Sequence, residues 1–182
     1  ATAAVITQIP ASVMDAGYAT TTAASIASLY LFIAIPGKLV LGHIYDRYGV
    51  KAGILFGNTM FFLSVVCLIF IKHQPFLYLM AILFGFGTCI GTVSAPVITS
   101  GIFGTKHYAE IYGFLSLFPS VGYALGGPLI ASAYDLTGSY NIAWIIVAVL
   151  SIVMTAFLLY SYRVSRVCIK EQEKTADKQK TQ

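Results

Sequence analysis

Charged residues are scarce in this chain of 182 residues, since only 10% are Asp, Glu, Lys or Arg while 58% are hydrophobic. A mean hydropathy of +0.81 excludes an ordinary water-soluble domain. The few charges are also unevenly placed, because nine lie in residues 1–162 and another nine in residues 163–182. The composition therefore predicts a body solvated by lipid, followed by a polar tail.

Cysteine and histidine are rare as well, with three of each. Cys67 and Cys89 fall in apolar stretches and Cys168 in the tail, which excludes a disulfide framework. The histidines lie at the ends of apolar stretches or between them, so they neither reach mid-membrane serines nor face each other as haem ligands. We therefore expect no enzyme, no cofactor and no metal site. The basic residues gather in the tail, which is typical of a cytoplasmic flank and not of nucleic-acid binding.

Six apolar segments make up the predicted membrane body. About 20 helical residues cross a hydrocarbon layer roughly 30 Å thick, and four segments of 20 to 24 residues contain no Asp, Glu, Lys, Arg or His. A fifth carries only Lys38 and His43, both near its end, and the first is too short to cross. We predict a partial helix at 1–11, spanning helices at 19–43, 52–71, 76–99, 112–133 and 141–162, and a charged cytoplasmic tail at 163–182. Because the partial helix starts without Met, we expect the chain to be one half of a longer protein.

Basic residues test this number of crossings independently. If each helix carries the chain to the opposite face, ten of the eleven basic residues fall on one face and only Lys72 falls on the other. The face rich in Lys and Arg is the cytoplasmic one. We therefore predict a multi-pass protein of the plasma membrane with a cytoplasmic C-terminus.

An internal repeat relates the first three segments to the last three. A shift of 89 positions places residues 45–49 (YDRYG) over 134–138 (YDLTG) and Gly37 over Gly126. Each copy follows the second helix of a three-helix set, and three crossings put the two copies on opposite faces. One pattern on both faces indicates an inverted-topology repeat of three plus three helices. A chance match of common turn residues is the alternative.

Prolines and glycines predict how the helices are placed. Segments 52–71 and 141–162 contain no proline, whereas the other four do. Since proline frees a backbone carbonyl that lipid cannot satisfy, we expect those four segments to face the protein interior and these two to face lipid. Glycines at GxxxG spacing permit close helix contacts, which we predict at Gly87, Gly91, Gly122 and Gly126.

Polar groups at mid-membrane depth are uncharged in every span. Most of the Ser and Thr hydroxyls there are expected to bond their own helix backbone. Larger groups, or groups beside a helix break, are better candidates for contact with a substrate: Gln8, Tyr30, Ser120 and Tyr123.

The strongest motif, GHIYDRYGVK at residues 42–51, lies between the second and third segments. It resembles the loop signature of the major facilitator superfamily, G-x-x-x-D-R-x-G-x-[KR], at every fixed position, and the candidate gating residues are Gly42, Asp46, Arg47, Gly49 and Lys51. In physical terms, Gly42 permits close helix approach, Asp46 can cap or salt-bridge a helix end, and Gly49 allows a tight turn. A positively flanked turn without a gating role is the alternative.

The resemblance covers nearly the whole chain. It implies an all-α, polytopic six-helix bundle that forms the carboxy-terminal half of a twelve-helix transporter. Residues 103–113, 126–128 and 135–140 are similar to the oxalate/formate antiporter and monocarboxylate transporter branch. The implied partners are the missing amino-terminal half, the lipid bilayer and a small solute, for which a carboxylate is one candidate. The implied mechanism is alternating access, in which the residue 42–51 loop latches one state.

One departure from the branch bears on the solute. Members of this branch tend to hold a carboxylate with a membrane-embedded cation in this half, yet segments 19–43 and 112–133 offer none at mid-depth. Either the solute is not an anion, or the clamp for an anion lies in the absent half. A six-helix channel or scaffold, or an intramembrane enzyme, is the alternative function.

Overall fold

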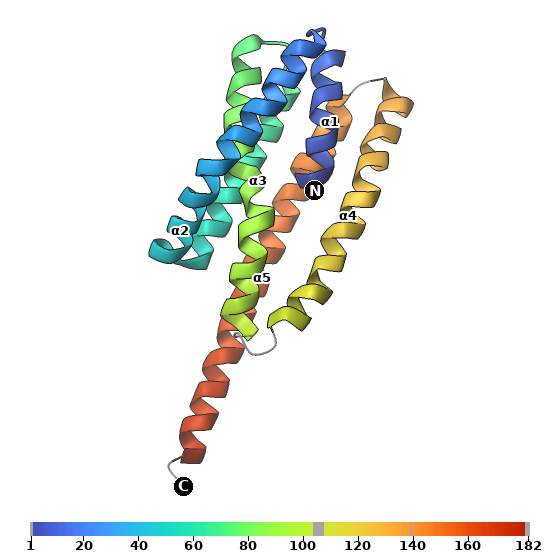
Figure 1. The fold of residues 1–182 in the computed structure, drawn as a ribbon. Helices are drawn as coiled ribbons and strands as arrows, with labels where there is room; N and C mark the ends of the chain where they lie inside the picture. Colours follow the sequence, from blue (N-terminus) through green and yellow to red (C-terminus); the bar gives the residue numbers. More distant parts are fainter. Residues whose placement is uncertain (1, 104–107, 139, 181–182) are drawn as a thin grey trace.

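The computed structural model describes residues 2–103, 108–138 and 140–180 (Figure 1), and every regular element in this part of the chain is a helix. Five helices follow one another: α1 (Thr2–Asp15), α2 (Thr20–Ile69), α3 (Gln74–Phe103), α4 (Tyr108–Thr137) and α5 (Tyr140–Lys180). The last four contain stretches long and apolar enough to cross a membrane. The all-helical, multi-pass fold class predicted from the sequence is therefore confirmed.

Helix α2 is a pair of helices joined at a backbone break. Gly49 lies in the break with φ 82° and ψ 172°, a conformation that side chains with a β-carbon rarely adopt. The break divides α2 into arm A (residues 20–48) and arm B (residues 50–69), and the chain turns back on itself there (Figure 1). With the two arms counted separately, six helical segments lie in the six apolar stretches of the sequence.

The connections lie at two opposite ends of the bundle (Figure 1). The α1–α2, α2–α3 and α4–α5 connections share one end, which we call the loop end. There the Tyr18 hydroxyl donates to the carbonyl oxygens of Ile71 and Lys72, each at 3.2 Å. The Tyr134 hydroxyl donates to Oδ1 of Asp15 at 2.7 Å. The break in α2, the last turn of α3 and the first turn of α4 lie toward the opposite end, the bend end, past which α5 continues.

Close backbone contacts pack α3 against both arms of α2. A β-carbon added at Gly85 would lie 2.9 Å from the carbonyl oxygen of Tyr30 in arm A, and one added at Gly87 would lie 2.7 Å from the backbone nitrogen of Phe61 in arm B. Only glycine lets helices approach this closely. The buried Phe84 ring adds an edge-on contact to Tyr30 and a tilted contact to Phe61, with centroids 5.2 and 6.1 Å apart. The centre of the core therefore lies between α2 and α3.

Arm B, which was predicted to face lipid because it contains no proline, has a buried and an exposed side. Ile54, Phe61 and Leu68 are buried, whereas Leu55 and Leu63 are exposed. The buried side packs closely on α3, where a β-carbon at Gly57 would lie 3.0 Å from the Ile90 side chain. Helix α4 contrasts with arm B: every residue from 113 to 125 is exposed.

Candidate functional site

The loop motif forms the bend between arms A and B. The positive φ of Gly49 makes the tight turn that the motif predicts, since a β-carbon would be strained in that conformation. Asp46, Arg47 and Lys51 are exposed around the turn. The guanidinium carbon of Arg47 lies 6.0 Å from the centroid of the Tyr48 ring, within cation–π range. The motif thus presents a carboxylate and two cations at the bend end.

The close helix approach predicted at Gly42 occurs at other glycines. A β-carbon at Gly42 would meet nothing within 4 Å. One added at Gly37 would lie 3.0 Å from Sγ of Cys89 in α3, and one added at Gly53 would lie 2.5 Å from the Tyr45 ring. The close glycine contact of arm A with α3 at Gly37 therefore lies more than one helical turn before the motif.

A buried hydrogen bond behind the bend was missed by the sequence analysis. Tyr45 is only 5% exposed, its ring covers Gly53 of arm B, and its hydroxyl shares a hydrogen bond with the hydroxyl of Ser94 in α3. Tyr45 therefore ties the end of arm A to both arm B and α3, directly beside Asp46. Its signal in the sequence was its alignment with Tyr134 in the internal repeat.

Two of the four predicted substrate residues are tied to helix backbones inside the bundle. The Gln8 amide donates to the carbonyl oxygen of Gly127 in α4 at 3.4 Å, and the Tyr30 hydroxyl donates to the carbonyl oxygen of Ile6 at 3.5 Å. Both bonds connect α1 to a neighbouring helix. Bonds of this length are weak. Gln8 is half-buried, whereas Tyr30 is only 3% exposed and belongs to the core.

The other two predicted substrate residues lie on the exposed stretch of α4. The Ser120 hydroxyl donates to the Ser116 carbonyl oxygen of its own helix at 2.9 Å, and Tyr123 is 52% exposed. Gly127, to which Gln8 bonds, comes one helical turn after Tyr123. The structure therefore brings α1 to α4 at Gly127, one helical turn beyond the exposed polar stretch, while Tyr30 lies on arm A. The assignment of these four residues to substrate binding stays a prediction.

The four predicted packing glycines have different surroundings. Gly87 lies against the backbone of Phe61, as its spacing predicts. Gly91 is exposed, and a β-carbon at Gly122 would meet nothing within 4 Å. Gly126 is half-buried and faces a cavity next to α5. A role for Gly122 in close packing therefore requires a neighbour other than the described helices.

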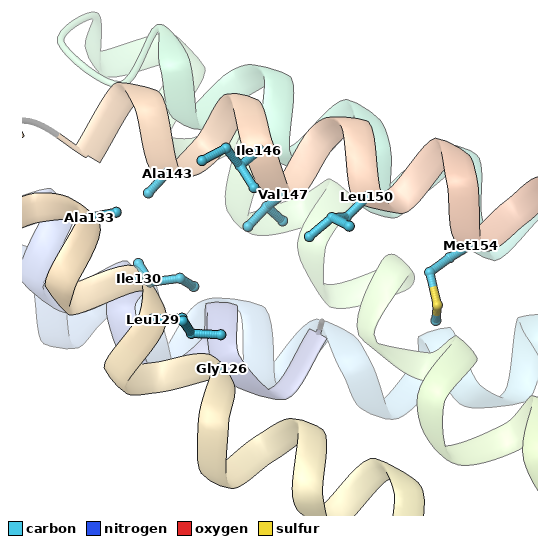
Figure 2. A pocket seen from close by; sticks show the side chains of 9 residues that line it. All are labelled: Gly126, Leu129, Ile130, Ala133, Ala143, Ile146, Val147, Leu150 and Met154. Carbon is cyan, nitrogen blue, oxygen red and sulfur yellow. The ribbon is translucent and has the colours of Figure 1, made fainter.

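An apolar cavity of about 420 Å³ separates α4 from α5 (Figure 2). Its lining contains no side chain that forms hydrogen bonds and consists of Gly126, Leu129, Ile130, Ala133, Ala143, Ile146, Val147, Leu150 and Met154. Pockets that recognise polar solutes carry a few placed polar groups. This cavity is therefore not the place where a polar solute would be held.

Long apolar helices and a charged bend define a polytopic membrane protein. Within residues 2–103, 108–138 and 140–180, no three His, Cys, Asp or Glu side chains come together as metal ligands would. Residues 1–181 match the family model described as Major Facilitator Superfamily, and the chain belongs to this superfamily.

Curated relatives are similar to parts of this chain. Monocarboxylate transporter 14 of Mus musculus is 27% identical over 136 residues, which cover 74% of this chain and 26% of that protein. Monocarboxylate transporter 9 of Pongo abelii is 32% identical over 110 residues, covering 59% and 21%. MFS-type transporter 1 of Ophiocordyceps sp. (strain BCC 1869) is 52% identical over 44 residues, covering 24% and 10%. The chain thus spans about a quarter of the length of the first of these relatives. No solved structure matches it.

Proposed function

We propose that this chain is the carboxy-terminal half of a secondary transporter that moves a small solute across the plasma membrane by alternating access. Membership of the superfamily supports a transporter, and the monocarboxylate transporters among its relatives favour a small carboxylate as the solute. The observation that carries the proposal is the open face of α4, where every residue from 113 to 125 is exposed.

The polar side of this stretch favours a protein partner over lipid. Phe114 and Phe118 lie on one side of the helix, and Ser116, Ser120 and Tyr123 lie on the opposite side, because residues two apart point in nearly opposite directions. The apolar side suits lipid, whereas the hydroxyl-bearing side suits a second protein bundle. Small residues on the same stretch would allow a second bundle to approach closely. An amino-terminal six-helix bundle packed on this face would enclose a path lined by polar groups of both halves.

The proposed mechanism follows from that arrangement. Two bundles rock about a site near the bilayer midplane, to which this half contributes Gln8, Tyr30, Ser120 and Tyr123. These groups can orient a carboxylate but cannot neutralise it, so the counter-charge is assigned to the other half. The bend end is assigned to the cytoplasm, because its loop carries Lys and Arg. There Asp46 and Arg47 would stabilise one access state.

Uptake by the full-length protein in liposomes tests the proposal. We expect saturable uptake of radiolabelled lactate, inhibited by unlabelled pyruvate and not by lactamide, which has the same shape without the charge. Ser120→Ala should raise KM. Ser132→Ala is the matched control, because the Ser132 hydroxyl bonds its own helix in the same way, at the Leu129 carbonyl oxygen. Unsaturable flux of lactate and lactamide alike would point to a channel, and no lactate uptake would exclude this carboxylate class.

A further inference from the structure

We propose that Tyr45 and Tyr134 are matched positioning residues that fasten the two three-helix repeats to each other, one toward each end of the bundle. The first repeat consists of α1, arm A and arm B, and the second of α3, α4 and α5. The proposal rests on the proposed function in one respect: transport by rocking requires that the bundle move as one body.

The internal repeat places the two tyrosines at equivalent positions. A shift of 89 residues lays Tyr45 over Tyr134 and Gly37 over Gly126. Tyr45 lies at the end of arm A and Tyr134 in the last turn of α4, so each ends the second helix of its own repeat. The break that ends arm A and the end of α4 lie toward opposite ends of the bundle (Figure 1).

Each tyrosine hydroxyl bonds the first helix of the other repeat. The Tyr45 hydroxyl bonds Ser94 in α3, which begins the second repeat. The Tyr134 hydroxyl donates to Oδ1 of Asp15 at 2.7 Å, at the end of α1, which begins the first repeat. The partner group is a hydroxyl in one case and a carboxylate in the other. In both cases, however, the second helix of one repeat is joined to the first helix of the other repeat.

Glycine crossings follow the same exchanged pattern. Arm A crosses α3 at Gly37, where a β-carbon would lie 3.0 Å from Sγ of Cys89, and this thiol donates to the carbonyl oxygen of Ala34 at 3.4 Å. Helix α4 meets α1 at Gly127, next to Gly126, where Gln8 donates to the glycine carbonyl oxygen at 3.4 Å and an added β-carbon would lie 3.8 Å from Oγ1 of Thr7, an ordinary contact. In each repeat the second helix therefore meets the partner helix at a glycine, closely at Gly37 and at ordinary distance at Gly127, and is fastened by tyrosine two turns further on.

The two fastenings are local to their ends. Tyr45 is buried, and its ring also covers Gly53, so Tyr45→Phe keeps the packing and removes only the hydrogen bond. The Tyr134 ring stacks on Tyr140 with centroids 4.4 Å apart, so Tyr134→Phe keeps that contact and removes a charge-assisted bond. Each change should therefore loosen one end and leave the other as it was.

Thiol-labelling rates in the full-length protein, in detergent and without Cys168, measure each end separately when they are determined site by site by peptide mass spectrometry, since Cys67 and Cys89 are also free thiols. A cysteine at Val97 reports on the bend end, because Val97 packs against the cluster that contains Tyr45. A cysteine at Val13, which is fully buried near Asp15, reports on the loop end. We expect Tyr45→Phe to speed labelling at position 97 by about two- to tenfold, the range for one lost hydrogen bond, with position 13 unchanged. Tyr134→Phe should do the reverse.

Three further variants and an uptake measurement make the test specific. Tyr160→Phe, at an exposed tyrosine of α5, should change neither rate. Asp15→Asn keeps an acceptor oxygen without the charge and should label at a rate between wild type and Tyr134→Phe, whereas Asp15→Ala should label like Tyr134→Phe. Equal changes at both ends, or none at either, would overturn the proposal. Labelling needs no solute, so absent uptake by the wild type would refute the proposed function alone.

Discussion

Replacing Gly87 with alanine tests the packing of α3 on arm B. The added β-carbon would lie 2.7 Å from both the nitrogen and the Cα of Phe61, which are backbone atoms that cannot rotate away. Overpacking costs about 1–3 kcal/mol, and contact with backbone places this site in the upper half of that range. Alanine returns about 1 kcal/mol through its helix propensity. The net expectation is a loss of about 1–2 kcal/mol.

Thermal unfolding of the purified protein in detergent measures this loss. At about 2–4 °C per kcal/mol for a chain of this size, Gly87→Ala should lower Tm by about 2–8 °C. Gly42→Ala is the matched control, since Gly42 is also in a helix and a β-carbon there would meet nothing within 4 Å. It should keep or raise Tm. A Gly87→Ala protein as stable as Gly42→Ala would refute the close packing of α3 on arm B.

Three further substitutions test the bend and the core. Asp46→Asn should lower the rate of transport by the full-length protein more than the affinity for its solute, because Asp46 is assigned to an access state and not to the site; wild-type turnover would contradict that role. Gly49→Ala should destabilise the protein by about 1–2 kcal/mol, since its φ of 82° is unfavourable for alanine, and an unchanged Tm would show that the break tolerates a β-carbon. Asn58→Leu should raise Tm, because Nδ2 of this buried side chain has no hydrogen-bond partner among the described residues. An unpaired buried donor costs about 1–3 kcal/mol of stability. A fall in Tm would mean that the amide is paired.

Two sequence features made the fold predictable: the long runs without charged residues and the glycine at position 49. The hydrocarbon thickness sets a minimum helix length, so uncharged runs of about 20 residues mark the helices. The turn at Gly49 followed from the motif, because only glycine takes a φ of 82° with a ψ of 172° without strain. Both features are local in sequence, which is why they could be read before any contact was known.

Contacts between helices were less predictable, because spacing along one helix does not say which face meets a partner. GxxxG spacing selected Gly87, which packs closely, together with Gly122, where a β-carbon would meet nothing within 4 Å. It passed over Gly85, which lies against arm A. The bond from Tyr45 to Ser94 joins residues 49 positions apart. This bond depends on the rotation and the axial offset of arm A relative to α3. A single sequence does not give these two quantities, and its one pointer to Tyr45 was the alignment with Tyr134 in the internal repeat.

The most direct test of the six-segment topology is labelling of single cysteines with a membrane-impermeant reagent in sealed, inside-out vesicles, in a background without Cys168. Cysteines at Arg47 and Lys170 should both react from the cytoplasmic side, while a cysteine at Lys72 should react only after the vesicles are opened. Reaction of positions 47 and 170 from different sides would contradict the alternating crossings on which the transporter half is built.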